Sequence, residues 1–201
     1  MTNSAVHITA WRRWATQHRL AAAVVAGIVA THIGTVFAFF LGGLGLARVD
    51  WSTANGAVYM PLAGDAHFSD TTRFLFGTGM HYVDGILFAI IFAVAFHPLL
   101  PFRSTPHGNM VKGVVFGLIL TFVSLVILAP YVYGPAFGMK SGIGPGSVGF
   151  LAHHAPGGWE WTIGAVLFHI VYGLHLGLIY NPTDEEDHSI TRDRQAVLAG
   201  A

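Results

Sequence analysis

The chain lacks cysteine entirely and has few charged residues, which make up 10% of its 201 positions. Without cysteine it cannot form disulfides, thiolate metal sites, cysteine-ligated iron–sulfur clusters or thiol nucleophiles. Ten basic and ten acidic residues give a formal net charge of zero, so we expect no nucleic-acid partner. The sequence also lacks paired carboxylates, a nucleophile–base arrangement and a phosphate-binding loop. We therefore do not expect this chain to be an enzyme on its own.

Apolar residues make up 53% of the chain and raise its mean hydropathy to +0.58. This surplus is typical of membrane proteins. Four apolar stretches, at 20–46, 74–100, 111–133 and 159–180, each reach the roughly 20 residues that a helix needs to cross about 30 Å of hydrocarbon. The sequence therefore predicts an all-α integral membrane protein, with residues 20–181 forming an up-down bundle of four transmembrane helices.

The distribution of basic residues predicts the orientation of this bundle. Four crossings leave both termini on one side of the membrane. Seven basic residues lie on that side and three lie in the connections on the other side, which indicates cytoplasmic termini by the positive-inside rule. We expect residues 1–19 to form a cytoplasmic segment, residues 182–201 to form a cytoplasmic tail, and the protein to lie in the inner or plasma membrane.

The second and fourth apolar stretches resemble each other. Each places a histidine four residues before a glycine, His81 before Gly85 and His169 before Gly173, and the two histidines are 88 positions apart. Residues 24–31 align with residues 114–121 at a similar offset of 90. Matched histidine, glycine and threonine residues do not follow from apolarity alone. The pattern predicts two parallel helix-pair repeats, at about 20–100 and 111–181, related by an axis along the membrane normal.

The repeated histidines are candidate site residues, because a histidine in hydrocarbon is costly unless something pairs with it. At roughly 1.5 Å per residue, His81 and His169 lie about 11 and 15 Å from the outer ends of their helices. His32 in the first helix falls in the same layer, and Asp84 shares a helix face with His81. Because the second and fourth helices of an up-down ring lie diagonally, His81 and His169 should face each other across the bundle.

Three interpretations of this histidine layer are open. A b-type haem would be held between His81 and His169, with room for the macrocycle given by four glycines that helix packing also explains, Gly27, Gly85, Gly117 and Gly173. A copper, zinc or iron ion, or a proton relay, would instead use the metal-ligand set His32, His81, Asp84 and His169. In the third interpretation the histidines only hold the bundle together, and Asp84 bonds Tyr172, a histidine or a backbone group.

These interpretations lead to competing functional hypotheses. The first is a subunit of a larger membrane redox complex that holds a haem or a metal in the histidine layer. The second is an accessory or scaffolding subunit without a cofactor, and the third is a small transporter or channel that depends on Asp84. The expected partners are the lipid bilayer, other membrane protein subunits and an amphipathic ligand such as a quinone. The quinone would lie near Tyr131 and Tyr133, where Pro130 should kink or end the third helix.

Overall fold

The computed structural model of the chain describes residues 9–60 and 68–184, and every regular element within these ranges is a helix. Four helical stretches are long and apolar enough to cross a membrane: Arg19–Leu44, Asp70–Leu99, Pro106–Ala136 and Gly158–Ile179. They confirm the four stretches predicted from the sequence, although the second and third begin earlier than expected. Residues 1–8 of the predicted amino-terminal segment and residues 185–201 of the predicted tail lie outside the described residues.

Most of the membrane-crossing stretches combine several elements. The first joins α2 (Arg19–Phe40) to the 3₁₀-helical η1 (Leu41–Leu44), and the fourth is α8 alone (Gly158–Ile179). The second joins α4 (Asp70–Ile91), the π-helical η2 (Phe92–Phe96) and α5 (His97–Leu99). The third joins α6 (Pro106–Val123), the π-helical η3 (Ser124–Tyr133) and α7 (Gly134–Ala136). Three short helices lie outside these stretches: α1 (Ala10–Gln17), α3 (Trp51–Tyr59) and the 3₁₀-helical η4 (Phe150–Ala152).

The long helices pack as a ring. The main interfaces join α6 to α8, α8 to α2, and α2 to α4, while α4 approaches α6 through η2. This order puts α4 and α8 across the ring from each other, as the up-down arrangement predicts. One hydrogen bond spans that diagonal, since the hydroxyl of Tyr172 on α8 donates to the carbonyl oxygen of Gly85 on α4 at 2.7 Å.

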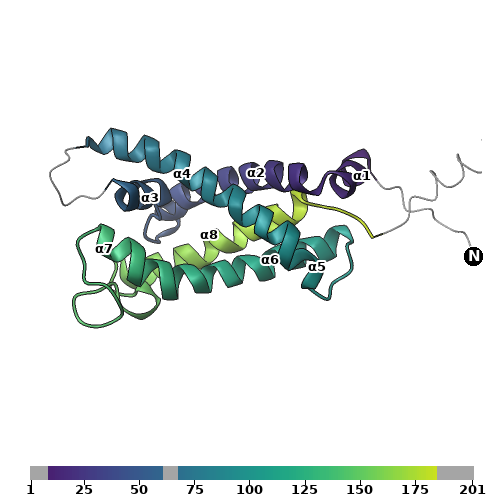
Figure 1. The fold of residues 1–201 in the computed structure, drawn as a ribbon. Helices are drawn as coiled ribbons and strands as arrows, with labels where there is room; N and C mark the ends of the chain where they lie inside the picture. Colours follow the sequence, from purple (N-terminus) through teal and green to yellow (C-terminus); the bar gives the residue numbers. More distant parts are fainter. Residues whose placement is uncertain (1–8, 61–67, 185–201) are drawn as a thin grey trace, which may run out of the picture.

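The two ends of the bundle differ in what covers them (Figure 1). At one end, which we call the terminal end, α1 meets the chain that follows α8, and the indole N–H of Trp11 donates to the carbonyl oxygen of Ile179 at 2.7 Å. At the opposite end, which we call the loop end, α3 and α7 gather (Figure 1). The described chain therefore begins and ends at the same end of the bundle.

Glycines set the closeness of the helix pairs. On α6, a methyl group added at Gly113 or Gly117 would clash with a backbone carbonyl of α8. The converse holds for Gly173 and Gly177 on α8, where an added methyl would clash with carbonyls of α6. Small residues let membrane helices approach until their backbones touch. The space beside the glycines that were predicted to make room for a macrocycle is therefore filled by a neighbouring helix. At Gly27, too, an added methyl group would clash with α4.

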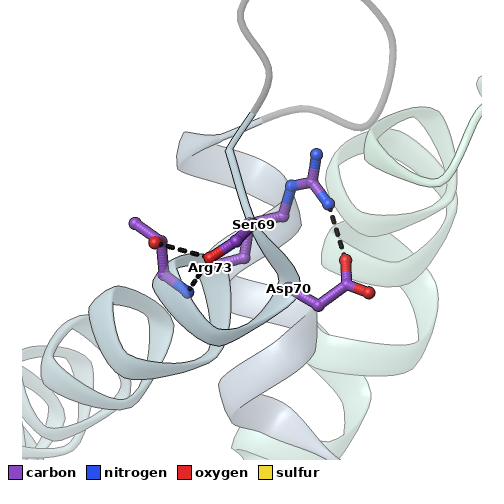
Figure 2. A network of polar contacts seen from close by, with 4 residues as sticks. Ser69, Asp70 and Arg73 are labelled. Carbon is purple, nitrogen blue, oxygen red and sulfur yellow. Dashed lines mark hydrogen bonds and ion pairs between the residues drawn. The ribbon is translucent and has the colours of Figure 1, made fainter.

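The first turn of α4 is fixed by polar side chains (Figure 2). The hydroxyl of Ser69 accepts a hydrogen bond from the backbone N–H of Thr72 at 3.1 Å, which caps the helix. Asp70 in the first turn pairs with Arg73 at 3.0 Å (Figure 2). An acidic residue is favourable there because of the positive end of the helix dipole. This turn abuts α3, since a methyl added at Gly56 would clash with the carbonyl of Arg73.

Pro130 does not end the third helix. The prediction that the helix could end at this position is wrong, because η3 runs from Ser124 through Pro130 to Tyr133 in π geometry. The predicted kink stays a prediction. Proline removes one backbone donor and crowds the preceding turn, and a π-helical segment relieves that crowding without breaking the helix. The carbonyl of Pro130 accepts from the backbone N–H of Gly142, which ties the following loop to the helix at 3.0 Å.

Candidate functional site

A small cavity lies inside the bundle near the loop end. Its volume is about 50 Å³, enough for a few water molecules. Helices α2, α4, α6 and α8, together with α3 and η3, contribute to its wall. The lining includes eight residues with polar side chains: Thr31, Asn55, His81, Asp84, Ser124, Tyr133, His169 and Tyr172. We call it the histidine cavity.

His81 and His169 both line this cavity, each eleven residues after the first residue of its helix, Asp70 or Gly158. The hydroxyl of Thr35 donates to a backbone carbonyl one turn earlier in α2, so it can only accept from His81 Nε2, at 3.0 Å. His81 therefore carries its proton on Nε2. Its Nδ1 has no hydrogen-bond partner among the described residues.

His169 has the opposite tautomer. Its Nδ1 lies 2.8 Å from the carbonyl oxygen of Ala165, which can only accept, so Nδ1 carries the proton. Its Nε2 has no partner in the part of the chain that the structure describes. The ring packs edge-on against Trp51, with centroids 5.7 Å apart. Each imidazole is thus held by one N–H, and in its neutral form it keeps one lone pair without a partner among the described residues.

Asp84 is held by α3 rather than by a histidine. The amide nitrogen of Asn55 donates to its carboxylate at 3.1 Å, and the amide oxygen of Asn55 accepts from the hydroxyl of Tyr133 at 2.9 Å. The expected bond between Asp84 and Tyr172 is absent from the described contacts, because Tyr172 donates to the Gly85 carbonyl instead. A three-residue chain therefore links η3, α3 and α4 beside the two imidazoles.

His32 does not join the other candidates. It is exposed on the surface of the bundle, where its Nδ1 lies 2.7 Å from the hydroxyl of Tyr82, and it does not line the histidine cavity. The depth estimate placed it at the right level, but its position on α2 turns it away from the interior. Among residues 9–60 and 68–184, no three histidine, aspartate or glutamate side chains are arranged to hold a metal ion.

The histidine cavity is small for a macrocycle. Its 50 Å³ is well below the roughly 300 Å³ at which cofactor pockets usually begin. The space beside His169 is filled by ring contacts with Trp51 and with Phe168, whose ring centroids lie 5.7 and 5.1 Å from the imidazole. The residues present therefore fit a proton, water or a single ion better than a haem.

A second polar cluster, at the terminal end, was not anticipated from the sequence. Asn109 on α6 is 0% exposed; its amide oxygen accepts from His97 Nε2 at 2.9 Å, and its amide nitrogen donates to Asn181 Oδ1 and to the Pro182 carbonyl. Each of these hydrogen-bonding groups has a partner, which fixes the chain after α8 against α6 and α5. No signal in the sequence pointed to it, because Asn109 precedes the apolar stretch predicted at 111–133 and has polar neighbours in His107 and Lys112.

Two cations are also buried at the terminal end. Arg12 of α1 is 5% exposed and donates to the carbonyl oxygens of Ser104, Asn181 and Pro182. Lys112 is 3% exposed and lies 3.4 Å from the hydroxyl of Ser104. Hydrogen bonding from Ser104 lowers the pKa of Asp184, which accepts from its backbone N–H at 3.0 Å. The cluster therefore closes this end of the bundle, because it joins α1, the loop before α6 and the segment 181–184 that follows α8.

Comparison with known proteins adds no relative to this geometry. No protein-family model, no curated protein and no solved structure matches the chain. The function must therefore be argued from the residues themselves.

Proposed function

We propose that the chain is a subunit of a larger membrane redox complex, and that its histidine cavity is a hydrated proton-binding site centred on His81 and His169. One observation carries the proposal: both imidazoles line one cavity, and each keeps one ring nitrogen without a partner among the described residues. A neutral imidazole with a free lone pair accepts a proton. Ionisable groups inside membrane helices commonly serve proton paths.

The surroundings favour one added proton on the pair. Two imidazolium charges sharing so small a cavity would repel each other strongly in a medium of low dielectric. Asp84 lines the same cavity and supplies a compensating carboxylate, while water in a cavity of about 50 Å³ would connect the lone pairs. The chain would then hold or pass a proton, and electron transfer would belong to partner subunits.

A single copper, zinc or iron ion is the second candidate for the same site. Two imidazole lone pairs on one cavity favour it, because neutral imidazole is a good ligand for these metals. Asp84 would have to leave Asn55 to become a third ligand, and His32 is too far round the helix to be a fourth. A b-type haem would require Trp51 and Phe168 to move out of the bundle interior.

Nitrogen NMR of protein labelled with ¹⁵N-histidine, in lipid nanodiscs, tests the proton site. We expect a titrating signal that disappears in both His81→Ala and His169→Ala. His175→Ala is the matched control, because His175 lies on the same helix and bonds the carbonyl four residues earlier as His169 does, yet does not line the cavity. Signals from His81 and His169 that stay unchanged from pH 4 to pH 9 would contradict the proposal.

Absorption and metal analysis of natively isolated protein separate the alternatives. A stoichiometric Soret band lost in His81→Ala would replace the proton site with a haem site. Tight stoichiometric copper, zinc or iron, lost in the same variant but retained in His175→Ala, would replace it with a metal site. Neither result is expected from the geometry described above.

Membership of a larger complex is supported by apolar residues outside the membrane-crossing stretches. Ile143 and Phe150 are 53% and 51% exposed, and they lie between the third and fourth stretches, outside the segments that are long and apolar enough to cross a membrane. A contiguous exposed apolar patch can mark contact with another protein, and we propose that Ile143 and Phe150 belong to such a patch. We expect the chain to migrate as a larger assembly in mild detergent, and Phe150→Glu to shift it toward the size of the isolated chain. An unshifted, monomer-sized native protein would contradict this.

We also propose that the termini are cytoplasmic and that the halves arose by duplication. Gly27 packs against α4 near Gly85, and Gly117 packs against α8 near Gly173, so residues at matching positions of the halves make matching contacts. Because the chain has no cysteine, single cysteines report sidedness directly. A membrane-impermeant maleimide should label Lys140→Cys in intact cells and label His107→Cys only after lysis. The reverse pattern would invert the proposed orientation.

A further inference from the structure

A second and larger cavity lies at the loop end, next to the histidine cavity. Its volume of about 480 Å³ falls within the roughly 300–1,000 Å³ typical of small-molecule sites. Residues 48–54, 129–139 and 148–161, three segments far apart in the chain, contribute its lining. Trp51 and Tyr133 line both cavities, so they form the wall between them. We call this second cavity the loop-end pocket.

Aromatic rings dominate the walls of the loop-end pocket. Trp51, Tyr133, Phe137 and Trp161 all line it. The ring of Trp51 lies 5.9 Å from that of Tyr133 and 5.7 Å from that of Trp161, centroid to centroid. Aromatic rings attract one another in offset and edge-to-face arrangements beyond what their buried area gives. Such walls favour a flat ring over a flexible chain.

Among the polar side chains that line the pocket, Arg48 and Trp51 have no hydrogen-bond partner in the described chain, and both are donors. Asp50 and Thr53 satisfy each other, because both carboxylate oxygens of Asp50 accept from Thr53, at 3.0 and 2.9 Å. The guanidinium of Arg48 lies 4.3 Å above the ring of Phe39 and has no hydrogen bond or ion pair to a described residue. The indole N–H of Trp51 is buried without a partner among the described residues. The complementary ligand therefore carries acceptor oxygens.

We propose that the loop-end pocket binds the head group of a quinone, a lipid-soluble ring that carries carbonyl oxygens. The ring packs against the aromatic wall that Trp51 and Trp161 form together, and a carbonyl oxygen accepts from Arg48 at the rim. The pocket lies where the third membrane-crossing stretch ends, at Ala136, and the fourth begins, at Gly158. The ends of membrane-spanning helices lie near the interface, which a molecule dissolved in the bilayer can reach. The aromatic walls and the unpaired donors indicate a flat ligand that carries acceptor oxygens. The choice of a quinone among such ligands rests on the proposal that the chain is a redox subunit.

Binding of 2-methyl-1,4-naphthoquinone to the full chain in lipid nanodiscs tests the assignment, with quenching of tryptophan fluorescence as the readout. We expect saturable quenching in the parent protein. Arg48→Gln should weaken the affinity about tenfold, because a hydrogen bond from a charged donor is lost. Arg103→Gln, an exposed arginine at the terminal end, is the matched control and should change nothing.

Further variants locate the bound ring. Ala155 lines the pocket, so Ala155→Trp should fill it and abolish saturable quenching. Trp161→Phe should remove part of the quenching amplitude, whereas Trp159→Phe should not, because Trp159 is 57% exposed and does not line the pocket. The proposal is overturned if the saturable quenching of tryptophan fluorescence is the same in the parent protein, in Arg48→Gln and in Ala155→Trp.

A competition experiment separates a ring from an acyl chain. Laurate offers an anionic head and a flexible tail, and we expect it not to displace the quinone at equal concentration. Displacement of the quinone by laurate that depends on Arg48 would instead identify a fatty-acid pocket and overturn the proposal. His81→Ala should leave quinone affinity within about twofold, so loss of quinone binding and loss of histidine titration can be told apart.

Discussion

Two buried asparagines, Asn55 at the loop end and Asn109 at the terminal end, show how the two ends of the bundle differ. Asn109 hydrogen-bonds His97, Asn181 and the Pro182 carbonyl, and it lines neither the histidine cavity nor the loop-end pocket. Asn55 also makes two hydrogen bonds, to Asp84 and Tyr133, but all three residues border the histidine cavity. Asn109 therefore closes the terminal end, whereas Asn55 lines a cavity that it shares with His81 and His169.

The histidines of the two ends differ in their surroundings rather than in their hydrogen bonds, because each has a partner at only one ring nitrogen among the described residues. His97 gives its Nε2 proton to Asn109 and packs edge-on against Phe92 and Tyr180, with centroids 5.6 and 5.2 Å apart. His81 and His169 each keep a lone pair that nothing in the described chain uses. Fully satisfied polar networks rigidify a core, whereas partly satisfied ones inside a protein need a functional or solvent explanation. The terminal end also has groups that lack a partner in the described chain, the His97 Nδ1 and the Tyr180 hydroxyl, but neither residue lines either cavity. We expect function at the loop end because His81 and His169 share a cavity there.

The largest effect should come from Asn109→Ala. It leaves the His97 donor and the side-chain oxygen of Asn181 without their partner in a buried interior, while the Pro182 carbonyl keeps Arg12, so we expect the free energy of unfolding to fall by about 3 kcal/mol. Asn55→Ala should cost only about 1 kcal/mol, because water in the histidine cavity can reach Asp84 and Tyr133. Thermal unfolding of both variants in the same lipid nanodiscs compares them. Equal losses would erase the distinction between the two ends.

The next largest effect should come from Gly77→Ala, which separates α3 from α4. A methyl group at Gly77 would clash with the Ser52 carbonyl and the backbone of Gly56, so we expect a loss of about 2 kcal/mol. Gly79→Ala is the matched control on the same helix, because nothing lies within 4 Å of its added methyl. It should be neutral or stabilising by up to about 1 kcal/mol, through helix propensity.

Because α3 carries Trp51 and Asn55, Gly77→Ala should also change the site. Quinone affinity and the histidine titration should both be disturbed in Gly77→Ala and unchanged in Gly79→Ala. A Gly77→Ala protein that unfolds at the parent temperature and keeps both properties would show that α3 is not held by this contact.

A smaller effect is expected from Tyr133→Phe, which removes the hydroxyl that donates to Asn55. The loss should be about 1 kcal/mol, the usual net value of one hydrogen bond. Tyr131→Phe, two residues earlier and 55% exposed, should have no measurable effect on unfolding. The difference between the two variants should vanish in an Asn55→Ala background, since the acceptor is then gone; a difference that persists would place the role of Tyr133 elsewhere.

The sequence predicted the membrane-crossing helices well because their signal is length and apolarity, which depend on no distant contact. It also brought His81, Asp84 and His169 to one level, since depth follows from helix rise. His32 was misplaced because depth says nothing about which side of a helix faces inward, and the low amphipathicity of α2 gave no guide. That His32, His81, Asp84 and His169 bind a metal ion together stays a prediction.

The helix α3 and the terminal-end cluster were harder to predict from the sequence. Trp51 and Asn55 sit in a connection whose inward docking depends on Gly56 and Gly77 meeting across space. Arg12 reads as a positive-inside charge at the membrane surface, and only the fold reveals that it donates to three carbonyls from distant segments. Such contacts join residues more than ninety positions apart, so no local pattern carries them.

The smallest effect should come from Asp184→Asn and should depend on pH. Hydrogen bonding from Ser104 gives Asp184 a lower pKa in the folded chain than its ordinary value of 3.8. Its contribution to stability is therefore fully present above that value and is lost as the pH falls through the lower pKa of the folded state. At pH 6 we expect Asp184→Asn to cost less than about 1 kcal/mol, because the carboxylate is exposed. Unfolding temperatures of parent and variant should converge under strongly acidic conditions; a gap that widens on acidification would mean that the carboxylate is better stabilised in the unfolded chain.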